Sequence, residues 1–328
     1  MAVVVRPCLS SPFSFPPSPS SLSLRLSTTR RTLPPLTFRS SCSSSSASSN
    51  MEDSQHGERP SLKDFPYVSA LHRDLMVDLV STVETRLHTH LLPCTLPPDV
   101  QYYHNQTGTA RASLQIRSGH QSSPINFILG SWLHAELPSG GVLDITTLSA
   151  YLNSSTDAPH FVIELCRRSP TSLIFILDLP SRKDLLLHPD YLHDFYEATE
   201  LDRHRQKLLQ NVPEVQPYFS SSLYIRCSFS PTAILVSVDT EADGAERMEE
   251  IIRDNVRPIA VEVLGIWLDQ CTGAGREVGE MDTANLEKRD RLVRKKTAEN
   301  DLGSNLPSLF GPEVAGRVLE AIRKVFDA

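Results

Sequence analysis

Apolar residues after the first 60 positions change from a helical spacing to a strand spacing. Between residues 70 and 91 they recur three or four positions apart, which predicts a helix that ends before Pro93. From residue 110 apolar and polar residues alternate, as in a strand with one buried face. Further strand candidates span 125–137, 142–148, 160–167 and 171–179. Because the connections are too short for crossovers, we expect an antiparallel meander.

The rest of the chain returns to helical patterns. We predict a helix over 191–210, further strand over 221–238, and helices over about 244–271, 282–299 and 312–327. This order of elements predicts an α+β domain, in which helices cover both faces of a central, mainly antiparallel β-sheet.

The N-terminal 50 residues have a composition of their own. They contain sixteen serines, seven prolines and five arginines, but no lysine and no acidic residue. Such a segment cannot bury enough apolar surface to fold, and it is typical of a chloroplast transit peptide. We predict a disordered transit peptide over 1–50, a flexible leader over 51–63 and a single domain over 64–328. A disordered tail without a targeting role is the alternative.

Charge and hydropathy exclude several classes of protein. The 328-residue chain carries 32 basic and 39 acidic residues, a net charge of −7. Removing the five arginines of the N-terminal segment leaves 27 basic residues against the same 39 acidic ones. An acidic body argues against a nucleic-acid binder. No apolar run approaches the ~18 residues of a membrane-spanning helix, so no transmembrane segment is expected.

Common cofactor motifs are missing from the sequence. It has no Gly-x-x-x-x-Gly-Lys-Ser/Thr loop, no Gly-x-Ser-x-Gly and no His-Glu-x-x-His. The glycines between 273 and 279 follow a helical pattern rather than a strand, so we interpret them as a loop. The cysteines after residue 50 are too widely spaced for a zinc or iron–sulfur site. We therefore expect no bound metal.

Two acidic residues are candidates for chemistry. Alternation over residues 160–166 places Glu164 on the face opposite Phe161 and Ile163, on a strand that is apolar on both sides. Burial of this kind favours the neutral form of a carboxyl group. Taken alone, Glu164 is more typical of a structural carboxylate paired with an arginine, and Asp301 of a residue that ends a helix.

Several blocks of sequence, taken together, resemble the red chlorophyll catabolite reductase family, which is related in fold to the ferredoxin-dependent bilin reductases. They include Phe65-Pro-Tyr-Val-Ser69, Leu96-Pro-Pro-Asp-Val100, Gly130-Ser-Trp132, Ile176-Leu-Asp-Leu-Pro180 and Phe229-Ser-Pro-Thr-Ala233. The matches run in order over about residues 64–328. The resemblance implies an α/β/α sandwich and a homodimer.

The resemblance also implies an activity. Members of this family reduce the C20/C1 double bond of the open-chain tetrapyrrole left by pheophorbide a oxygenase, giving primary fluorescent chlorophyll catabolite. Reduced ferredoxin supplies the electrons, and the enzyme holds no cofactor of its own. The implied location is the chloroplast stroma, with a second compartment left open, and the implied setting is chlorophyll breakdown in senescence.

Site residues follow from the same resemblance. Its two pocket carboxylates correspond to Glu164 and Asp301, which we expect to supply protons. Phe229 corresponds to a pocket position that determines the product epimer. Trp132 and His134 share a strand face and are candidate substrate contacts, although a core histidine is the alternative for His134.

Electron entry requires a basic surface, because plant ferredoxins are acidic. The segment 288–296 is the densest basic run, and Arg291, Arg294, Lys295 and Lys296 are the predicted docking residues. An ordinary solvated helix face is the alternative, and Arg182 with Lys183 is a smaller candidate. Two other functions stay open: a protein that sequesters a photoreactive chlorophyll catabolite without turnover, and a reductase of biliverdin.

Overall fold

The structure is a computed structural model that describes residues 61–138, 140–220, 222–272 and 278–327. The predicted transit peptide, and the leader up to residue 60, lie outside the described residues. Ser61–Lys63, the end of the predicted leader, belong to the packed structure: Leu62 is buried in the short helical turn η1 (Leu62–Asp64).

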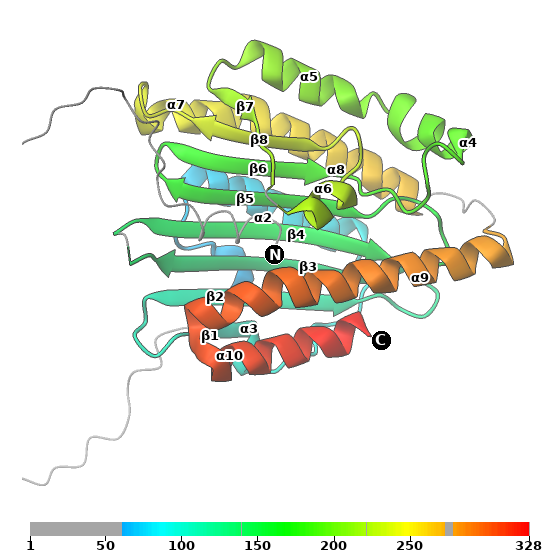
Figure 1. The fold of residues 1–328 in the computed structure, drawn as a ribbon, viewed down its shortest axis with the longest axis horizontal. Coiled ribbons are helices and arrows are strands. Elements are labelled where there is room, and N and C mark those ends of the chain that lie inside the picture. The colour runs from blue at the N-terminus through cyan, green and yellow to red at the C-terminus, as the bar shows by residue number, and fades with distance from the viewer. Residues whose placement is uncertain (1–60, 139, 221, 273–277, 328) are drawn as a thin grey trace, which may run out of the picture. The chain divides into compact units, whose positions relative to one another are not determined.

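The core is one eight-stranded antiparallel sheet with the order β1-β2-β3-β4-β5-β6-β8-β7 (Figure 1). Its strands are β1 (Tyr102–His104), β2 (Ala110–Ser118), β3 (Ile125–Glu136), β4 (Val142–Leu152), β5 (Phe161–Ser169), β6 (Ser172–Asp178), β7 (Val215–Pro217) and β8 (Ile234–Asp239). Strands β1 to β6 pair in chain order, so the predicted meander is confirmed. The tight links between them leave no room for a crossover helix.

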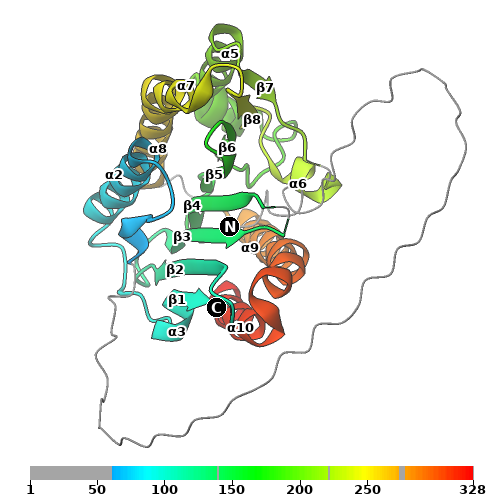
Figure 2. The ribbon, with the colours of Figure 1, turned by 90° about the vertical axis from the view of Figure 1, so that its left-hand side faces the viewer.

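Helices cover both faces of the sheet, as Figure 2 shows edge-on. On one side, here called the α2 face, lie α2 (Ala70–Arg86), α7 (Gly244–Ile251) and α8 (Arg257–Thr272), the last two joined by the π-helical turn η3 (Ile252–Val256). On the other, the α10 face, lie α3 (Pro98–Gln101) and α10 (Gly303–Phe326). Each face has its own apolar core, and the fold is the expected α+β sandwich.

The helix α9 (Glu280–Lys296) runs across the α10 face and continues through the π-helical turn η4 (Thr297–Leu302) into α10 (Figure 1). Within α10 the positive φ of Gly311, 79°, breaks the helix, and Pro312 begins the second part. This position suits both residues, since glycine tolerates positive φ and proline fits a first helical turn. The predicted start of a helix at residue 312 is therefore confirmed.

Two sequence predictions need correction. The predicted helix 191–210 is divided into α4 (Pro189–Leu192), a π-helical turn η2 (His193–Glu197) and α5 (Leu201–Asn211), with Glu200 at a positive φ of 54°. The predicted strand 221–238 begins instead as the helix α6 (Leu223–Ser228), and only residues from Ile234 form a strand. The Ser222 hydroxyl accepts a hydrogen bond from the Ile225 amide and caps α6, which explains why a helix begins there.

Candidate functional site

A row of polar side chains crosses three strands on the α10 face. Ser131 of β3 is paired with Thr147 of β4, and Thr147 with Glu164 of β5, so the three side chains point to the same side. All three are buried, and the Thr147 hydroxyl donates to Glu164 Oε2 at 3.3 Å. Ser131 Oγ has no hydrogen-bond partner within the described ranges. An unpaired hydroxyl at such a position is unusual, because buried polar atoms are normally paired.

Beside this row lies a small inner cavity of about 70 Å³. Val162 of β5 forms part of its floor, Phe229 at the end of α6 forms a wall, and Thr297 at the start of η4 closes it. Glu164 does not line the cavity itself. It lies two residues beyond Val162 on the same face of β5, roughly 7 Å along the strand.

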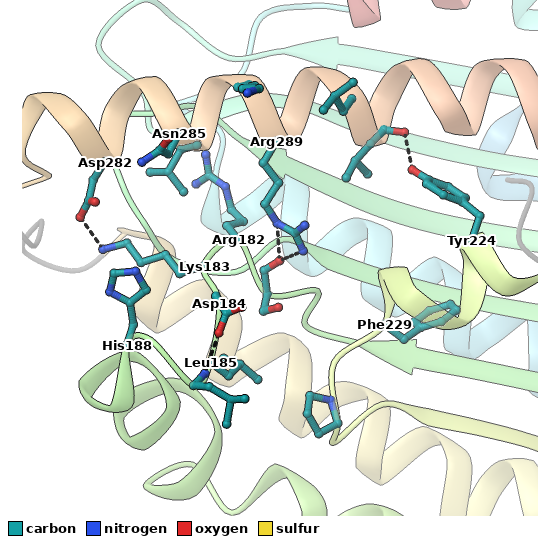
Figure 3. Close-up of a pocket in the computed structure, with 17 residues that line it drawn as sticks. Arg182, Lys183, Asp184, Leu185, His188, Tyr224, Phe229, Asp282, Asn285 and Arg289 are labelled. Carbon is teal, nitrogen blue, oxygen red and sulfur yellow. Dashed lines mark hydrogen bonds and ion pairs between the residues drawn. The ribbon is translucent and has the colours of Figure 1, made fainter.

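A larger outer cleft of about 790 Å³ opens between α6, α9 and the segment 181–188 (Figure 3). Its lining mixes apolar side chains with basic ones, among them Lys183, Lys288 and Arg289. Both spaces share three lining residues: Tyr224, Phe229 and Val293. The Tyr224 hydroxyl donates to the Val293 carbonyl at 3.4 Å, and this contact joins α6 to α9 where the two spaces meet.

The position of α9 over the cleft is fixed by a buried ion pair. Asp290 accepts from the Arg182 guanidinium, with an Nη2–Oδ2 distance of 2.5 Å. The same guanidinium donates to the carbonyls of Asn153, Thr156 and Ala158. Multiple hydrogen bonds of this kind are what a buried charged pair requires. Helix α9 is therefore held firmly against the loop between β4 and β5.

His160, which lines the inner cavity, completes this network. Its Nδ1 accepts from the Leu152 amide at 3.1 Å, so Nε2 carries the proton and donates to Asp290 Oδ1 at 3.1 Å. Burial lowers the pKa of His160 and keeps the ring neutral. Burial alone would raise the pKa of Asp290, but His160 and Arg182 hold it below its usual range. Both ring nitrogens of His160 are occupied, so this histidine has a supporting role.

The structure brings the elements of three predicted site residues to one region. Glu164 lies on the cavity side of β5, Phe229 lines both spaces, and η4, which contains Asp301, starts at the cavity with Thr297. The side chain of Asp301 lies outside what the structure describes.

Trp132 and His134 are not brought to this region, because they lie on the α2 face. Trp132 Nε1 donates to the Ser61 carbonyl at 3.1 Å. His134 Nδ1 lies 2.6 Å from Asp144 Oδ1, and its ring stacks on Tyr67 at 4.0 Å. His134 is therefore a core histidine with satisfied partners, as the alternative prediction had it.

The predicted docking residues on α9 fall into two groups. Arg294 is partly buried and donates to the Phe326 carbonyl at 2.8 Å, while Lys296 pairs with Glu299 at 3.0 Å. Arg291 and Lys295 are exposed, although Lys295 also lies 3.8 Å from Glu299.

The smaller basic candidate is wrong as a docking surface. Arg182 is buried against Asp290, and Lys183 pairs with both Asp157 and Asp282 at 2.9 Å. Neither cation is available to a partner in this arrangement.

Sequence reasoning missed Tyr224, His160 and Asp290. Their partners lie 69 to 130 residues away along the chain, so no local pattern identifies them. Thr147 carried a signal, because strand alternation over 142–152 would place it opposite Glu164 once the register of β4 and β5 is known.

The described residues contain neither a metal-binding cluster nor a membrane-spanning helix. Across the described ranges, no three His, Cys, Asp or Glu side chains are grouped so that they could hold a metal ion. Among the same residues, no helix is long and apolar enough to cross a membrane.

The fold is shared with a bilin reductase of known structure. The crystal structure of phytochromobilin synthase from tomato in complex with biliverdin superposes with a TM-score of 0.56. It covers 77% of this chain and 84% of that one, at 15% sequence identity, which shows the fold alone.

Sequence similarity gives the family. Residues 71–324 match the family described as red chlorophyll catabolite reductase (RCC reductase). Red chlorophyll catabolite reductase, chloroplastic, from Arabidopsis thaliana is 51% identical, over 84% of this chain and 87% of its own length. Red chlorophyll catabolite reductase 1, chloroplastic, from Oryza sativa subsp. japonica is 45% identical, over 79% of each chain. This chain belongs to the red chlorophyll catabolite reductase family.

Proposed function

We propose that this chain is a chloroplast reductase of chlorophyll catabolism that uses ferredoxin to reduce red chlorophyll catabolite. Two reduced ferredoxins deliver one electron each, and two protons add across the C20/C1 double bond, giving primary fluorescent chlorophyll catabolite. The observation that carries the proposal is family membership over residues 71–324, joined to a cavity beside a buried carboxyl group. We place the enzyme in the stroma, downstream of pheophorbide a oxygenase, as a homodimer without a bound cofactor.

The size and lining of the two spaces suit an open-chain tetrapyrrole. Ligand pockets usually have volumes of roughly 300–1,000 Å³, and the outer cleft, at about 790 Å³, falls in this range. The inner cavity is too small for the whole substrate. We infer that most of the tetrapyrrole occupies the outer cleft and that one ring passes Phe229 toward Glu164. This movement requires the Tyr224–Val293 contact to open.

Within this proposal Glu164 and Asp301 deliver the two protons. A carboxyl group that donates a proton works best when it is shielded from water and held in one position. Burial of Glu164 on β5, together with the hydrogen bond from Thr147, supports such a role. Phe229 then acts as a wall that leaves one side of the reacting ring open to protonation.

Ferredoxin docking is proposed on the exposed side of α9. Lys288, Arg291 and Lys295 follow one another at i, i+3 and i+7, so they lie along one side of the helix. All three are exposed, and Leu292 beside them is 51% exposed. Lys288 and Leu292 also line the outer cleft, so an acidic protein bound here would sit next to the substrate.

An anaerobic assay with reduced ferredoxin and red chlorophyll catabolite tests the proposal. We expect loss of red absorbance together with new blue fluorescence. Binding of the catabolite without any spectral conversion would support the sequestering protein instead. The experiment includes biliverdin as a competing substrate, because the tomato structure of the same fold contains it. Preferential reduction of biliverdin would overturn the substrate assignment.

A further inference from the structure

A third carboxyl group lies on the cavity side of the sheet, at the end of β6. Asp178 is paired in register with Val162 of β5, which forms part of the cavity floor. Directly paired residues point to the same side of a sheet, so Asp178 shares the α10 face with Glu164. Its side chain is buried, with 3% of its surface exposed.

Both oxygens of Asp178 accept hydrogen bonds from Ser230. The Ser230 amide donates to Oδ2 at 2.9 Å, and the Ser230 hydroxyl donates to Oδ1 at 2.5 Å. Ser230 directly follows Phe229 and is itself buried. The carboxylate therefore fixes the backbone immediately after the side chain that forms the cavity wall.

The residue before Phe229 in the chain, Ser228, belongs to α6. The Ser228 hydroxyl donates to the Tyr224 carbonyl at 2.8 Å, one turn earlier in the same helix. Phe229 has an extended backbone, with φ of −86° and ψ of 152°, and it connects this short helix to Ser230. No other side-chain hydrogen bond among the described residues ties residues 229–233 to the sheet, so the Asp178–Ser230 pair anchors this segment.

The charge state of Asp178 agrees with this geometry. Burial raises the pKa of Asp178 to about 6, and the hydrogen bonds from Ser230 act in the opposite direction. At neutral pH the ionised form still outnumbers the neutral form by about ten to one. An ionised carboxylate is an acceptor at both oxygens, as two donors from Ser230 require.

We propose that Asp178 is a positioning residue that sets which face of the tetrapyrrole is protonated, by fixing the Phe229 wall through Ser230. This inference rests on the proposed function, in which Phe229 controls the stereochemistry at C1. Asp178 need not touch the substrate.

The test compares product epimers from five variants under the anaerobic assay, the fifth being the rescue variant Ser230→Thr. Phe229→Val measures the wall itself. Asp178→Asn keeps the size of the side chain but turns an amide group toward one of the two donors. Ser230→Ala removes the hydroxyl and leaves the amide. Asp144→Asn is the matched control: it changes another buried aspartate, which lies on the α2 face and pairs with His134 and Arg167.

We expect Asp178→Asn to raise the fraction of the minor epimer by about tenfold, the usual effect of losing a hydrogen bond to a charged group. Ser230→Ala should change it in the same direction but less, and Ser230→Thr, which restores the hydroxyl, should recover the wild-type ratio. Asp144→Asn should leave the ratio unchanged. An equal shift in Asp144→Asn, or no shift in Asp178→Asn and Ser230→Ala, overturns the inference.

Hydrogen exchange separates this inference from the proposed function. Protection of the amides in 223–233 should fall in Asp178→Asn and stay at the wild-type level in Asp144→Asn, whatever the substrate is. If wild type does not reduce the catabolite but this loss of protection is found, the proposed function fails and the anchoring role stands. If Phe229→Val changes the epimer while Asp178→Asn and Ser230→Ala do not, only the inference fails. Should Asp178→Asn not fold, Ser230→Ala and its Ser230→Thr rescue decide alone.

Discussion

Thr146 and Thr147 are neighbours in β4, yet their hydroxyl groups lie on opposite faces of the sheet and contact different partners. Thr146 Oγ1 lies 2.8 Å from Nε2 of His72 on the α2 face. Thr147 Oγ1 donates to Glu164 on the α10 face. Both threonines are buried, so the environment of each face decides what its hydroxyl does.

On the α2 face the buried polar groups around Asp144 satisfy one another, although His72 Nδ1 has no hydrogen-bond partner within the described ranges. Asp144 receives hydrogen bonds from both His134 and Arg167, and the latter also donates to the Tyr67 carbonyl at 2.8 Å. A network closed in this way leaves little for a ligand to bind, and its expected contribution is to stability. On the α10 face, Ser131 Oγ has no partner within the described ranges, and a cavity lies next to the polar row. The α10 face differs because its polar row approaches this cavity, with Glu164 roughly 7 Å along β5 from Val162 of the cavity floor.

The largest expected effect tests the chemical role of the α10 face. Glu164→Gln keeps the size of the side chain but removes the proton that a carboxyl group can donate. Turnover of red catabolite should fall by a factor on the order of 10²–10⁴, the usual contribution of a positioned proton donor. The measurement is the anaerobic rate at saturating ferredoxin, alongside the binding affinity for the catabolite.

Asp144→Asn is the control for this loss. It changes a buried carboxyl group on the α2 face, so it should lower stability and leave the turnover of the folded enzyme near the wild-type value. If Glu164→Gln keeps full turnover, Glu164 is not a proton donor. The buried carboxyl groups of the two faces then do not differ in catalytic role.

The second prediction concerns acid sensitivity of the α2 face. Burial, and next the charge of Arg167, lower the pKa of His72 from 6.5 to about 3, while Asp144 has a smaller opposing effect. Below pH 6.5 the unfolded chain therefore binds a proton at His72 that the folded state excludes. The contribution of neutral His72 to the free energy of unfolding is complete above pH 6.5 and is lost as the pH falls toward 3. Between pH 6.5 and 5 the loss should be about 2 kcal/mol, because each pH unit in this range contributes about 1.4 kcal/mol.

His72→Gln removes this titration and retains a group that can bond to Thr146. Urea unfolding of wild type and His72→Gln is measured at pH 7 and pH 5. The free energy of unfolding should fall by about 2 kcal/mol less in the variant than in wild type. The difference between the two proteins is the quantity to compare, because burial also lowers the pKa of His160, which remains in both. Equal losses would show that His72 is not the acid-sensitive group of the α2 face.

The third prediction places electron entry on the α10 side. Reversing Arg291 and Lys295 to glutamate should raise the ferredoxin concentration for half-maximal rate by about tenfold at low ionic strength, since opposite charges steer association. The difference from wild type should shrink at high salt, because the Debye length falls from about 10 Å at 0.1 M to about 3 Å at 1 M. Affinity for the catabolite should hardly change.

The matched control reverses Arg86 and Arg253, which are exposed on helical segments of the α2 face and carry the same total charge. It should leave the ferredoxin response near that of wild type. If both pairs shift the response equally, net charge rather than a local docking surface controls association.

Sequence patterns predicted the sheet far better than the site. The meander from 110 to 179 follows from alternation and short connections, which are local properties. The strand predicted to begin at residue 221 is wrong because Leu223 and Ile225 are spaced as in a strand, whereas Leu223 is 65% exposed on a short helix. The cap at Ser222 is the signal that was missed.

The site depends on contacts between distant parts of the chain. Asp178 and Ser230 are 52 residues apart, and Arg182 and Asp290 are 108 residues apart. Such pairs follow from packing of α9 and α6 over the sheet rather than from periodicity. Glu164 and Phe229 were identified through family resemblance, because local sequence alone favoured a structural role for the carboxylate.

The smallest expected effect concerns the two adjacent threonines, Thr146 and Thr147. Thr147→Val replaces the hydroxyl that donates to Glu164 with a methyl group of similar shape, and Thr146→Val does the same beside His72. The Thr147–Glu164 distance, 3.3 Å, is long for a hydroxyl donor, so its loss should cost less than a short charge-assisted bond. We expect Thr147→Val to lower turnover by about two- to fivefold, with little change in the temperature of unfolding. Thr146→Val should instead lower stability by about 1 kcal/mol and leave turnover unchanged.

Rates and thermal unfolding of the two single variants and the double variant decide the matter. If Thr146→Val slows turnover as much as Thr147→Val, the sheet transmits the disturbance through its backbone, and the separation of roles between its two faces is wrong.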